Sequence, residues 1–266
     1  MTATTRRYGG PTRATDLGND VVAGLLAHRS VRAFLDAGVD DDVVAALVAA
    51  AQSASTSSNL QAWSVVSVRD PSRKARLAHL AGDQAFVERA PVFLVWVADL
   101  SRARRLAARS GVAVDAADYL ESTLVACIDT ALAAQNAVVA AESLGLGCVY
   151  VGAVRNHPEA VAAELGLPPS SVALFGLAVG VPDPSEDADV KPRLPQSAVW
   201  HHETYDADAA DASLPEYDER LAEYNRRHGM SDGWTGRVLT RLAGAGSLAG
   251  RHVLRETLDR MGLPSR

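Results

Sequence analysis

Residues 118–143 read DYLESTLVACIDTALAAQNAVVAAES, and this stretch is the strongest indication of the fold. It favours a helix about 40 Å long at 1.5 Å per residue, and Gly145 follows where a left-handed cap would end it. Its few charged residues are Asp118, Glu121, Asp129 and Glu142, and its apolar residues are spread around the whole helix. A helix of this kind must be covered on most sides. We therefore expect a central core helix, packed either within a monomer or against its own copy in a dimer.

Four short apolar runs rich in valine accompany this helix and are typical of strands: residues 63–68, 92–98, 148–151 and 172–181. Periodicity alone leaves a buried helix open for each run. Further helices are expected over residues 21–29, from Asp40 to about Ala51, over 214–227 and over 248–261. The last two are separated by a glycine-rich stretch that we expect to be mobile. Residues 53–59, rich in Ser and Thr, indicate a loop because small hydroxyl residues compete for backbone hydrogen bonds.

Composition excludes several classes of protein. The net charge of −6 argues against a general nucleic-acid or anionic membrane surface, because binding to phosphate polymers needs excess Lys and Arg. The N-terminus has no apolar signal-peptide core, and no stretch holds 18 uncharged apolar residues, so we expect a cytoplasmic protein. Cys127 and Cys148 lack CxxC spacing and are expected to be buried free thiols, with no metal site. Residues 1–20 are expected to be a flexible arm, and residues 21–266 a single domain with an extended C-terminal segment.

Two basic tracts stand out on this acidic chain: His28-Arg29-Ser30-Val31-Arg32 and Lys191-Pro192-Arg193. Arg meets a phosphate with two parallel charge-assisted hydrogen bonds, Lys adds a point charge, and Ser and His add neutral donors. Together the tracts could hold a dianionic phosphate monoester. Taken alone, each tract is also compatible with solvated surface charge. Proline before and after the second basic pair prevents a helix there.

The order of several motifs resembles the oxygen-insensitive, NADPH-dependent nitroreductase and flavin reductase branch of the nitroreductase superfamily. The resemblance covers about residues 25–261 and rests on eight pieces in the right order. They include His-Arg-Ser-x-Arg-x-Phe at 28–34, Asn-Leu-Gln at 59–61, Ala-Gln-Asn-Ala at 134–137, Glu-Ser-Leu-Gly-Leu-Gly at 142–147, Tyr-Val-Gly at 150–152, Leu-Phe-Gly-Leu at 174–177 and Lys-Pro-Arg-Leu-Pro at 191–195.

The resemblance implies an α+β fold, with a central, mainly antiparallel sheet flanked by helices in an intertwined homodimer. Extended C-terminal segments would embrace the partner, and one FMN would lie in each of two clefts at the interface. The two basic tracts would then meet on the FMN phosphate, and the long apolar helix would lie in the core of the dimer.

The resemblance also assigns residues to parts of the cofactor. The phosphate would be bound from the two tracts, through His28, Arg29, Lys191 and Arg193. Arg32 would lie near the pyrimidine end of the ring, where positive charge favours the reduced flavin. The rest of the flavin would be contacted by hydroxyls, an amide and a strand end, namely by Ser30, Thr56, Ser57, Ser58, Gln84, Tyr150, Val151 and Gly152.

Two positions depart from the family pattern. Asn59 stands where a bulky aromatic residue is common, and His228 stands where an Arg near the NADPH 2′-phosphate is expected. A neutral imidazole is a weaker anchor for a dianion than a guanidinium, so NADPH and NADH both remain candidate donors. Arg226, Arg227 or Arg251 are candidates to compensate. We therefore expect Asn59, His228 and Arg251 to influence the choice of NAD(P)H and substrate.

The resulting hypothesis is a ping-pong oxidoreductase that passes hydride from NAD(P)H through bound FMN to a nitroaromatic, quinone or related small molecule. The flavin carries the chemistry, and no side chain is expected to be an obligatory acid. Two alternatives stay open: an NAD(P)H:flavin reductase that supplies reduced flavin to a partner, and a flavin-binding or sensing protein with little turnover.

Overall fold

Four antiparallel strands form one sheet, in a computed structural model that describes residues 3–9 and 19–266. The strands are β1 (Trp63–Val68), β2 (Val92–Asp99), β3 (Gly147–Val151) and β4 (Ser171–Gly180), in the spatial order β1-β2-β4-β3. All four coincide with predicted runs to within one residue at each end. Every residue of β2 is buried because this central strand is covered on both faces.

Helices account for most of the remaining chain. Those between residues 20 and 165 are α2 (Asp20–Ala27), α3 (Asp41–Gln52), α4 (Pro71–Leu80), α5 (Ala85–Arg89), α6 (Ser101–Ser110), α7 (Leu120–Ser143) and α8 (Pro158–Leu165). The others are α1 (Ala3–Tyr8), α9 (Ala207–Ala212), α10 (Leu214–Arg227), α11 (Trp234–Leu242) and α12 (Leu254–Arg260). Short 3-10 turns include η2 (Ser57–Asn59), η4 (Gly152–Asn156), η6 (Ala245–Leu248) and η7 (Arg251–Val253).

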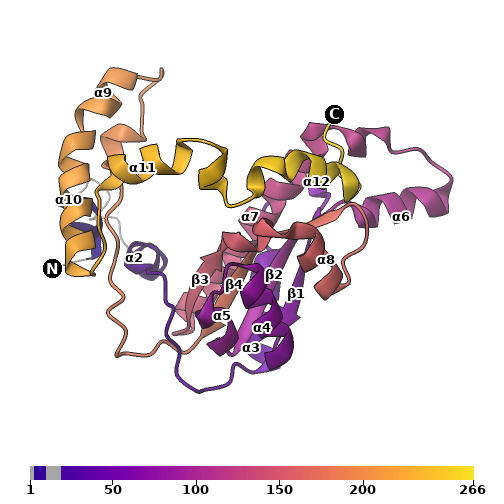
Figure 1. Cartoon of the computed structure of the whole chain (residues 1–266), viewed down its shortest axis with the longest axis horizontal. Coiled ribbons are helices and arrows are strands. Elements are labelled where there is room, and N and C mark those ends of the chain that lie inside the picture. The colour runs from indigo at the N-terminus through magenta and orange to yellow at the C-terminus, as the bar shows by residue number, and fades with distance from the viewer. Residues whose placement is uncertain (1–2, 10–18) are drawn as a thin grey trace. The chain divides into compact units, whose positions relative to one another are not determined.

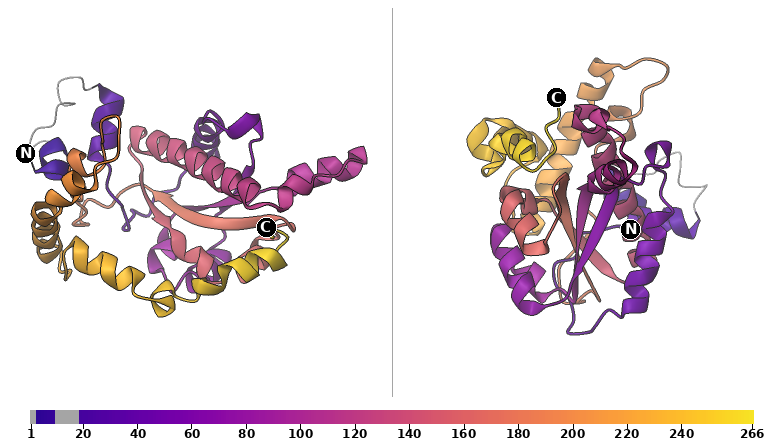
Figure 2. Two further views of the ribbon diagram at one scale, coloured as in Figure 1. Left: turned by 90° about the horizontal axis from the view of Figure 1, so that it is seen from above. Right: turned by 90° about the vertical axis from the view of Figure 1, so that its right-hand side faces the viewer.

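The sheet separates two apolar cores. Helices α3 and α7 cover one face, where Leu47 and Trp96 are fully buried, and α4, α5 and α8 cover the other, where Leu77 and Phe93 are fully buried. Trp96 and Phe93 belong to the same strand but face opposite cores, because side chains alternate along a strand. Figure 1 labels these elements, and the edge-on view in Figure 2 shows helices on both sides of the sheet.

Helix α7 runs along the sheet (Figure 2, left). It presents small residues to the strands, with Ala133, Ala134 and Ala137 fully buried. Its opposite side carries exposed apolar residues, including Ile128 at 56% exposure. Among the described residues this helix alone is long and apolar enough to cross a membrane by length and composition, yet its buried side packs against the core of the sheet. Gly145 has φ of +77°, which confirms the predicted left-handed end.

One helix is shorter than expected, and two stretches expected to be mobile or flexible contain helices. The helix expected over residues 248–261 begins only at Leu254, because 3-10 turns occupy the preceding residues. The glycine-rich stretch expected to be mobile contains helix α11. The expected flexible arm contains helix α1, whose Arg7 is buried with backbone partners; residues 1–2 and 10–18 of that arm lie outside the described residues.

Contacts divide the chain into two compact units. Unit 1 comprises residues 1–29 and 187–248, and unit 2 comprises residues 30–186 and 249–266. Unit 2 holds the whole sheet and both of its cores. Unit 1 has its own small apolar cluster around Tyr217, Leu221 and Tyr224 of α10. The single domain expected over residues 21–266 stays a prediction.

Candidate functional site

In unit 1 the two basic tracts are joined by Arg7 of helix α1. Its guanidinium donates to the carbonyl oxygens of Leu26, at 2.9 and 3.0 Å, and of His28, at 2.6 Å. The carbonyl of Arg7 accepts the backbone N–H of Arg193 at 2.9 Å. Arg7 is only 5% exposed, and a buried guanidinium needs such partners. Segments more than 160 residues apart in sequence, 28 and 193, are therefore held by one residue, the first through its side chain and the second through its backbone carbonyl.

The second tract lies along helix α10 of the same unit. The Tyr224 hydroxyl donates to the carbonyl of Asp189 at 3.2 Å, and the Tyr217 hydroxyl donates to the carbonyl of Pro192 at 3.4 Å. The Lys191 ammonium lies 5.6 Å from the centre of the Tyr224 ring. Two tyrosines thus fix the backbone of the tract, whereas the side chain of Arg193 is exposed. The exposed Arg29 provides a further cation from the first tract.

His228 is brought to the second tract by the end of α10, where it caps the helix. Its ring lies 4.3 Å from the Tyr224 ring, centre to centre, and its Nδ1 lies 3.1 Å from a carboxylate oxygen of Asp187. The side chain of His228 is only 12% exposed, whereas that of Asp187 is 85% exposed. An anion approaching this imidazole would therefore meet a carboxylate beside it.

In unit 2 the segment from Ser30 lies against the edge strand β3. Ser30 forms an isolated bridge with Cys148, and the N–H of Val31 donates to the carbonyl of Cys148 at 3.0 Å. This close approach requires glycine at position 147, because a Cβ there would lie 2.7 Å from Val31. The structure thus places Ser30 beside the strand that ends in the predicted Tyr-Val-Gly motif.

Arg32 is oriented by an acidic residue that the sequence did not single out. The carboxylate of Glu186 accepts the backbone N–H groups of Arg32 and Ala33, each at 3.0 Å. The Arg32 side chain itself is exposed. One carboxylate of the segment after Pro182 thus fixes the backbone at Arg32 and Ala33.

The predicted flavin contacts Thr56, Ser57 and Ser58 lie in a loop, residues 56–62 (the serine loop), that is held from the core by Asp129 of helix α7. One carboxylate oxygen accepts the Thr56 hydroxyl at 2.5 Å and the Ala62 N–H at 3.2 Å, and the other accepts the Ser57 N–H at 3.1 Å. Asp129 is 1% exposed. The sequence carried a signal for this role, because an acid in the middle of an apolar helix needs buried donors.

The backbone of this loop is in a costly conformation. Ser58, Asn59 and Gln61 have φ of +49°, +56° and +50°, in the left-handed region that side chains other than glycine disfavour. Each such residue costs roughly 1–3 kcal/mol. The side chains of Ser57, Ser58 and Asn59 are exposed as a result. The side-chain Oδ1 of Asn59 accepts a hydrogen bond from the Gln61 side-chain amide at 3.2 Å.

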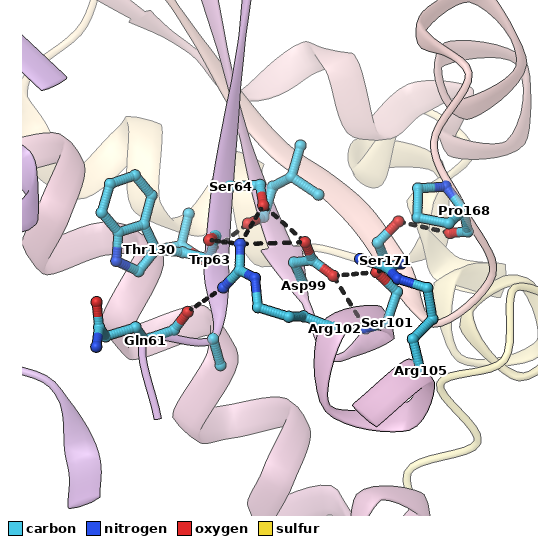
Figure 3. A network of polar contacts seen from close by, with 12 residues as sticks. Gln61, Trp63, Ser64, Asp99, Ser101, Arg102, Arg105, Thr130, Pro168 and Ser171 are labelled. Atoms are coloured by element: carbon cyan, nitrogen blue, oxygen red, sulfur yellow. Dashed lines mark hydrogen bonds and ion pairs between the residues drawn. The ribbon is translucent and has the colours of Figure 1, made fainter. Parts of the chain in front are cut away.

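A second polar network holds the other side of the loop (Figure 3). The Arg102 guanidinium donates to the carbonyl of Gln61 at 2.9 Å and to the Ser64 hydroxyl at 3.1 Å, and it lies 3.9 Å from Asp99. Asp99 also accepts hydrogen bonds from the Ser64 hydroxyl, at 2.6 Å, and from Ser101. Burial raises the pKa of Asp99, but the hydrogen bonds from Ser101 and Ser64 and the charge of Arg102 outweigh it and lower the pKa.

The predicted strand end closes this part of unit 2. Tyr150 lies edge-on to Phe175, with ring centres 5.1 Å apart, and burial raises the pKa of its hydroxyl. Val151 is buried, and Gly152 starts the turn η4. A Cβ at Gly152 would lie 3.3 Å from the Arg155 guanidinium, the movable end of a long side chain.

The remaining predictions concern Gln84, Arg251 and the two cysteines. Gln84 lies in the turn before α5, and its side-chain amide donates to the carbonyl of Gly82 at 3.2 Å. Arg251 lies in the short turn η7. Cys148 is a buried free thiol as expected, and burial raises its pKa to about 12. Cys127 is free but only half-buried, and burial raises its pKa too, so neither thiol is activated.

These features together define a class of protein. Helices cover both faces of a four-stranded antiparallel sheet; unit 1 carries a set of cationic side chains, and unit 2 carries a loop of exposed hydroxyls. This is the combination that the motifs predicted for the nitroreductase superfamily. Residues 25–181 match the Nitroreductase family, and residues 191–266 match the C-terminal domain of the Nitroreductase family. The chain therefore belongs to the nitroreductase family.

Relatives and solved structures agree with this assignment. The chain is 42% identical over 213 residues to FMN reductase (NADPH) of Bacillus subtilis, a match covering 78% of this chain and 84% of the relative. It is 40% identical over 219 residues to the oxygen-insensitive NADPH nitroreductase of Salmonella typhimurium, covering 80% and 87%. The solved NADPH:FMN oxidoreductase of Vibrio harveyi, complexed with NAD+, superimposes with a TM-score of 0.80 at 37% identity, covering 93% of this chain and all of that one.

Proposed function

We propose that this protein is an FMN-dependent oxidoreductase that takes hydride from NAD(P)H and passes it to a small-molecule acceptor in a ping-pong cycle. The observation that carries the proposal is the donor set of unit 1, in which Arg7 holds both basic tracts. Family membership and relatives named for FMN and NADPH support the same cofactors. When bound, FMN supplies the hydride chemistry at its ring.

The residues present fit the chemistry of FMN part by part. Arg29, Lys191 and Arg193, with His28, are donors suited to a phosphate dianion. Ser30, Ser57, Ser58, Gln84 and the backbone of 150–152 are neutral donors and acceptors suited to the ribityl chain and ring. The exposed guanidinium of Arg32 would favour the negative charge of the reduced ring. Thr56 contributes through the loop, because its hydroxyl proton is donated to Asp129.

We expect three residues to influence whether NADPH or NADH donates the hydride: His228, Asn59 and Arg251. His228 is paired with Asp187, so it offers a poor anchor for the extra phosphate of NADPH. We therefore propose that NADH is accepted as well as NADPH, with Asn59 of the exposed loop and Arg251 of η7 as further contributors to selectivity.

We further propose that the protein is a cytoplasmic homodimer in which α7 packs against its own copy. The support is an exposed apolar stripe on one side of α7, formed by Leu120, Leu124, Ile128 and Leu132. These residues recur every fourth position and so lie on one side of the helix. The net charge of −6 favours small-molecule acceptors over nucleic acid or an anionic membrane.

The acceptor is a nitroaromatic, a quinone or a similar planar compound. Supply of reduced flavin to a partner enzyme is a second candidate, favoured by the relative named FMN reductase. The two are separated by steady-state rates with free FMN, a nitroaromatic and a quinone under the same conditions.

An anaerobic stopped-flow experiment tests the proposal. The purified protein, loaded with FMN and freed of excess, should stay yellow and be bleached by NADPH and by NADH, and addition of a nitroaromatic or quinone should restore the colour. A protein that retains no FMN, or whose bound FMN neither nucleotide bleaches, would contradict it.

A further inference from the structure

The serine loop is held at different residues by two charged side chains of different helices. Asp129 of α7 accepts three hydrogen bonds, from Thr56, Ser57 and Ala62. Arg102 of α6 donates a hydrogen bond to the backbone carbonyl of Gln61. Asp129 therefore binds only hydrogen-bond donors of the loop, whereas Arg102 binds an acceptor. The loop is thus tied down at both ends of its strained segment, residues 58–61.

We propose that Asp129 and Arg102 are positioning residues, which fix the serine loop so that the hydroxyls of Ser57 and Ser58 face the flavin and its substrates. This role rests on the proposed function, because the exposed hydroxyls of Ser57 and Ser58 need a bound flavin to contact. Neither anchor touches substrate in the proposal; both act through the backbone of the loop.

The geometry at Asp129 requires a carboxylate. All three partners are donors: the Thr56 hydroxyl, the Ser57 N–H and the Ala62 N–H. Asparagine would turn an NH2 group toward at least one of them, because only one of its two terminal atoms accepts. Water cannot replace the lost acceptor easily, since Asp129 is 1% exposed.

Thr56 extends the anchor into the strained part of the loop. Its hydroxyl donates to Asp129 and accepts the N–H of Gln61 at 2.9 Å. A single hydroxyl therefore links the buried carboxylate to a residue with φ of +50°. Valine at position 56 would have nearly the same shape and neither hydrogen bond, whereas serine would keep both.

Arg102 is the more accessible of the two anchors. It binds the Gln61 carbonyl, and Ser64 and Asp99 keep its guanidinium in place. Its side chain is 55% exposed, so water can partly replace it. We therefore expect a smaller effect from Arg102→Gln than from Asp129→Asn, in the same direction.

Hydrogen exchange and kinetics together test the proposal. In Asp129→Asn the amides of Ser57 and Ala62, and in Thr56→Val the amide of Gln61, should exchange at least about tenfold faster than in the wild type, as expected for a lost hydrogen bond. Thr56→Ser should restore protection. The KM for NAD(P)H should rise about tenfold, while FMN affinity should fall by a smaller factor, because the phosphate donors of unit 1 are unchanged. Asp118→Asn, which alters a half-buried Asp of a different ion pair, with Arg104, is the matched control.

The outcomes are distinguishable. Unchanged exchange in both Asp129→Asn and Thr56→Val overturns the anchoring, and altered exchange with an unchanged KM overturns the positioning role. If Asp129→Asn does not fold, the nearly isosteric Thr56→Val decides. A wild-type protein whose flavin is not bleached contradicts the proposed function, whereas the exchange data, collected on flavin-free protein, still decide whether the two residues anchor the loop.

Discussion

At the residue scale, buried charges organise the loops of this protein. Arg7 is surrounded by backbone carbonyls and Asp129 by backbone and hydroxyl donors. Each charge is isolated from water, so its partners cannot leave without a large cost. A charge on a rigid helix therefore fixes a flexible segment far away in sequence. The exposed residues of the same loops, such as Ser57 and Arg193, remain available for ligands.

Arg193→Ala should weaken FMN binding by ~1.5–3 kcal/mol, which is roughly 10- to 100-fold in Kd, because one charged hydrogen bond to phosphate is lost. Fluorescence titration of flavin-free protein with FMN measures the change. Arg6→Ala removes another exposed arginine of unit 1, one paired with Asp189, and should change Kd by less than threefold. Equal Kd values for wild type and Arg193→Ala would show that Arg193 does not bind the phosphate.

Asp99 makes stability depend on acid pH. Because its pKa is lowered in the folded protein, its contribution is complete above the ordinary carboxyl pKa near 4 and is lost as pH falls through the folded value. Asp99→Asn should therefore lose ~1–3 kcal/mol at pH 7 but show a flatter decline below about pH 4. Urea unfolding across this range measures both effects. The exposed Asp115→Asn variant is the control, and parallel curves for wild type and Asp99→Asn would contradict the prediction.

At the scale of elements, helix α7 and strand β4 show how close packing sets local sequence. Small residues on one side of α7 let it approach the sheet, and its long apolar residues point the other way. In β4, Gly176 pairs with Val95, and the ring of Phe93 crosses the space where a side chain at 176 would be. Gly176 thus belongs to the packing around Phe93, in the core covered by α4, α5 and α8.

Gly176→Ala should be destabilising, because the new Cβ would lie 2.0 Å from the Phe93 ring, which is fully buried. Overpacking of this kind costs ~1–3 kcal/mol, or roughly 2–12 °C in Tm for a protein of this size. Thermal unfolding by circular dichroism measures it. Gly38→Ala, where nothing lies within 4 Å of the added Cβ, is the control. Adding Phe93→Leu to Gly176→Ala should recover part of the loss; no recovery would mean that the clash is not the cause.

At the scale of the whole molecule, the exposed stripe of α7 predicts assembly. Ile128→Glu puts a charge in the middle of this stripe, where burial against a second copy would leave it unpaired. The variant should therefore be monomeric under conditions in which the wild type is a dimer. Light scattering coupled to size exclusion gives the mass of each. Leu106→Glu, a substitution at an equally exposed leucine of α6, should stay dimeric. A wild type that is monomeric at micromolar concentration would contradict the expected dimer.

Much of the fold followed from local pattern. The four valine-rich runs became strands because short apolar runs bury well in a sheet covered on both faces. Helix α10 spans residues 214–227 as predicted. The C-terminal stretch was harder to predict. Its glycine-rich composition gave no sign of helix α11, and helix α12 is shorter than the predicted helix. At the site, the residue types of the two tracts indicated a phosphate, but their mutual approach through Arg7 was not visible in the chain.

The sequence by itself determined the strands, the long central helix, the two basic tracts and the family, because these are written in local periodicity and in motifs of fixed spacing. Only the tertiary structure decided which groups hold the site residues: Arg7 on the tracts, Glu186 on Arg32, and Asp129 with Arg102 on the serine loop. The physical reason is that a buried charge finds its partners across the folded core, and no local pattern records which loop those partners belong to.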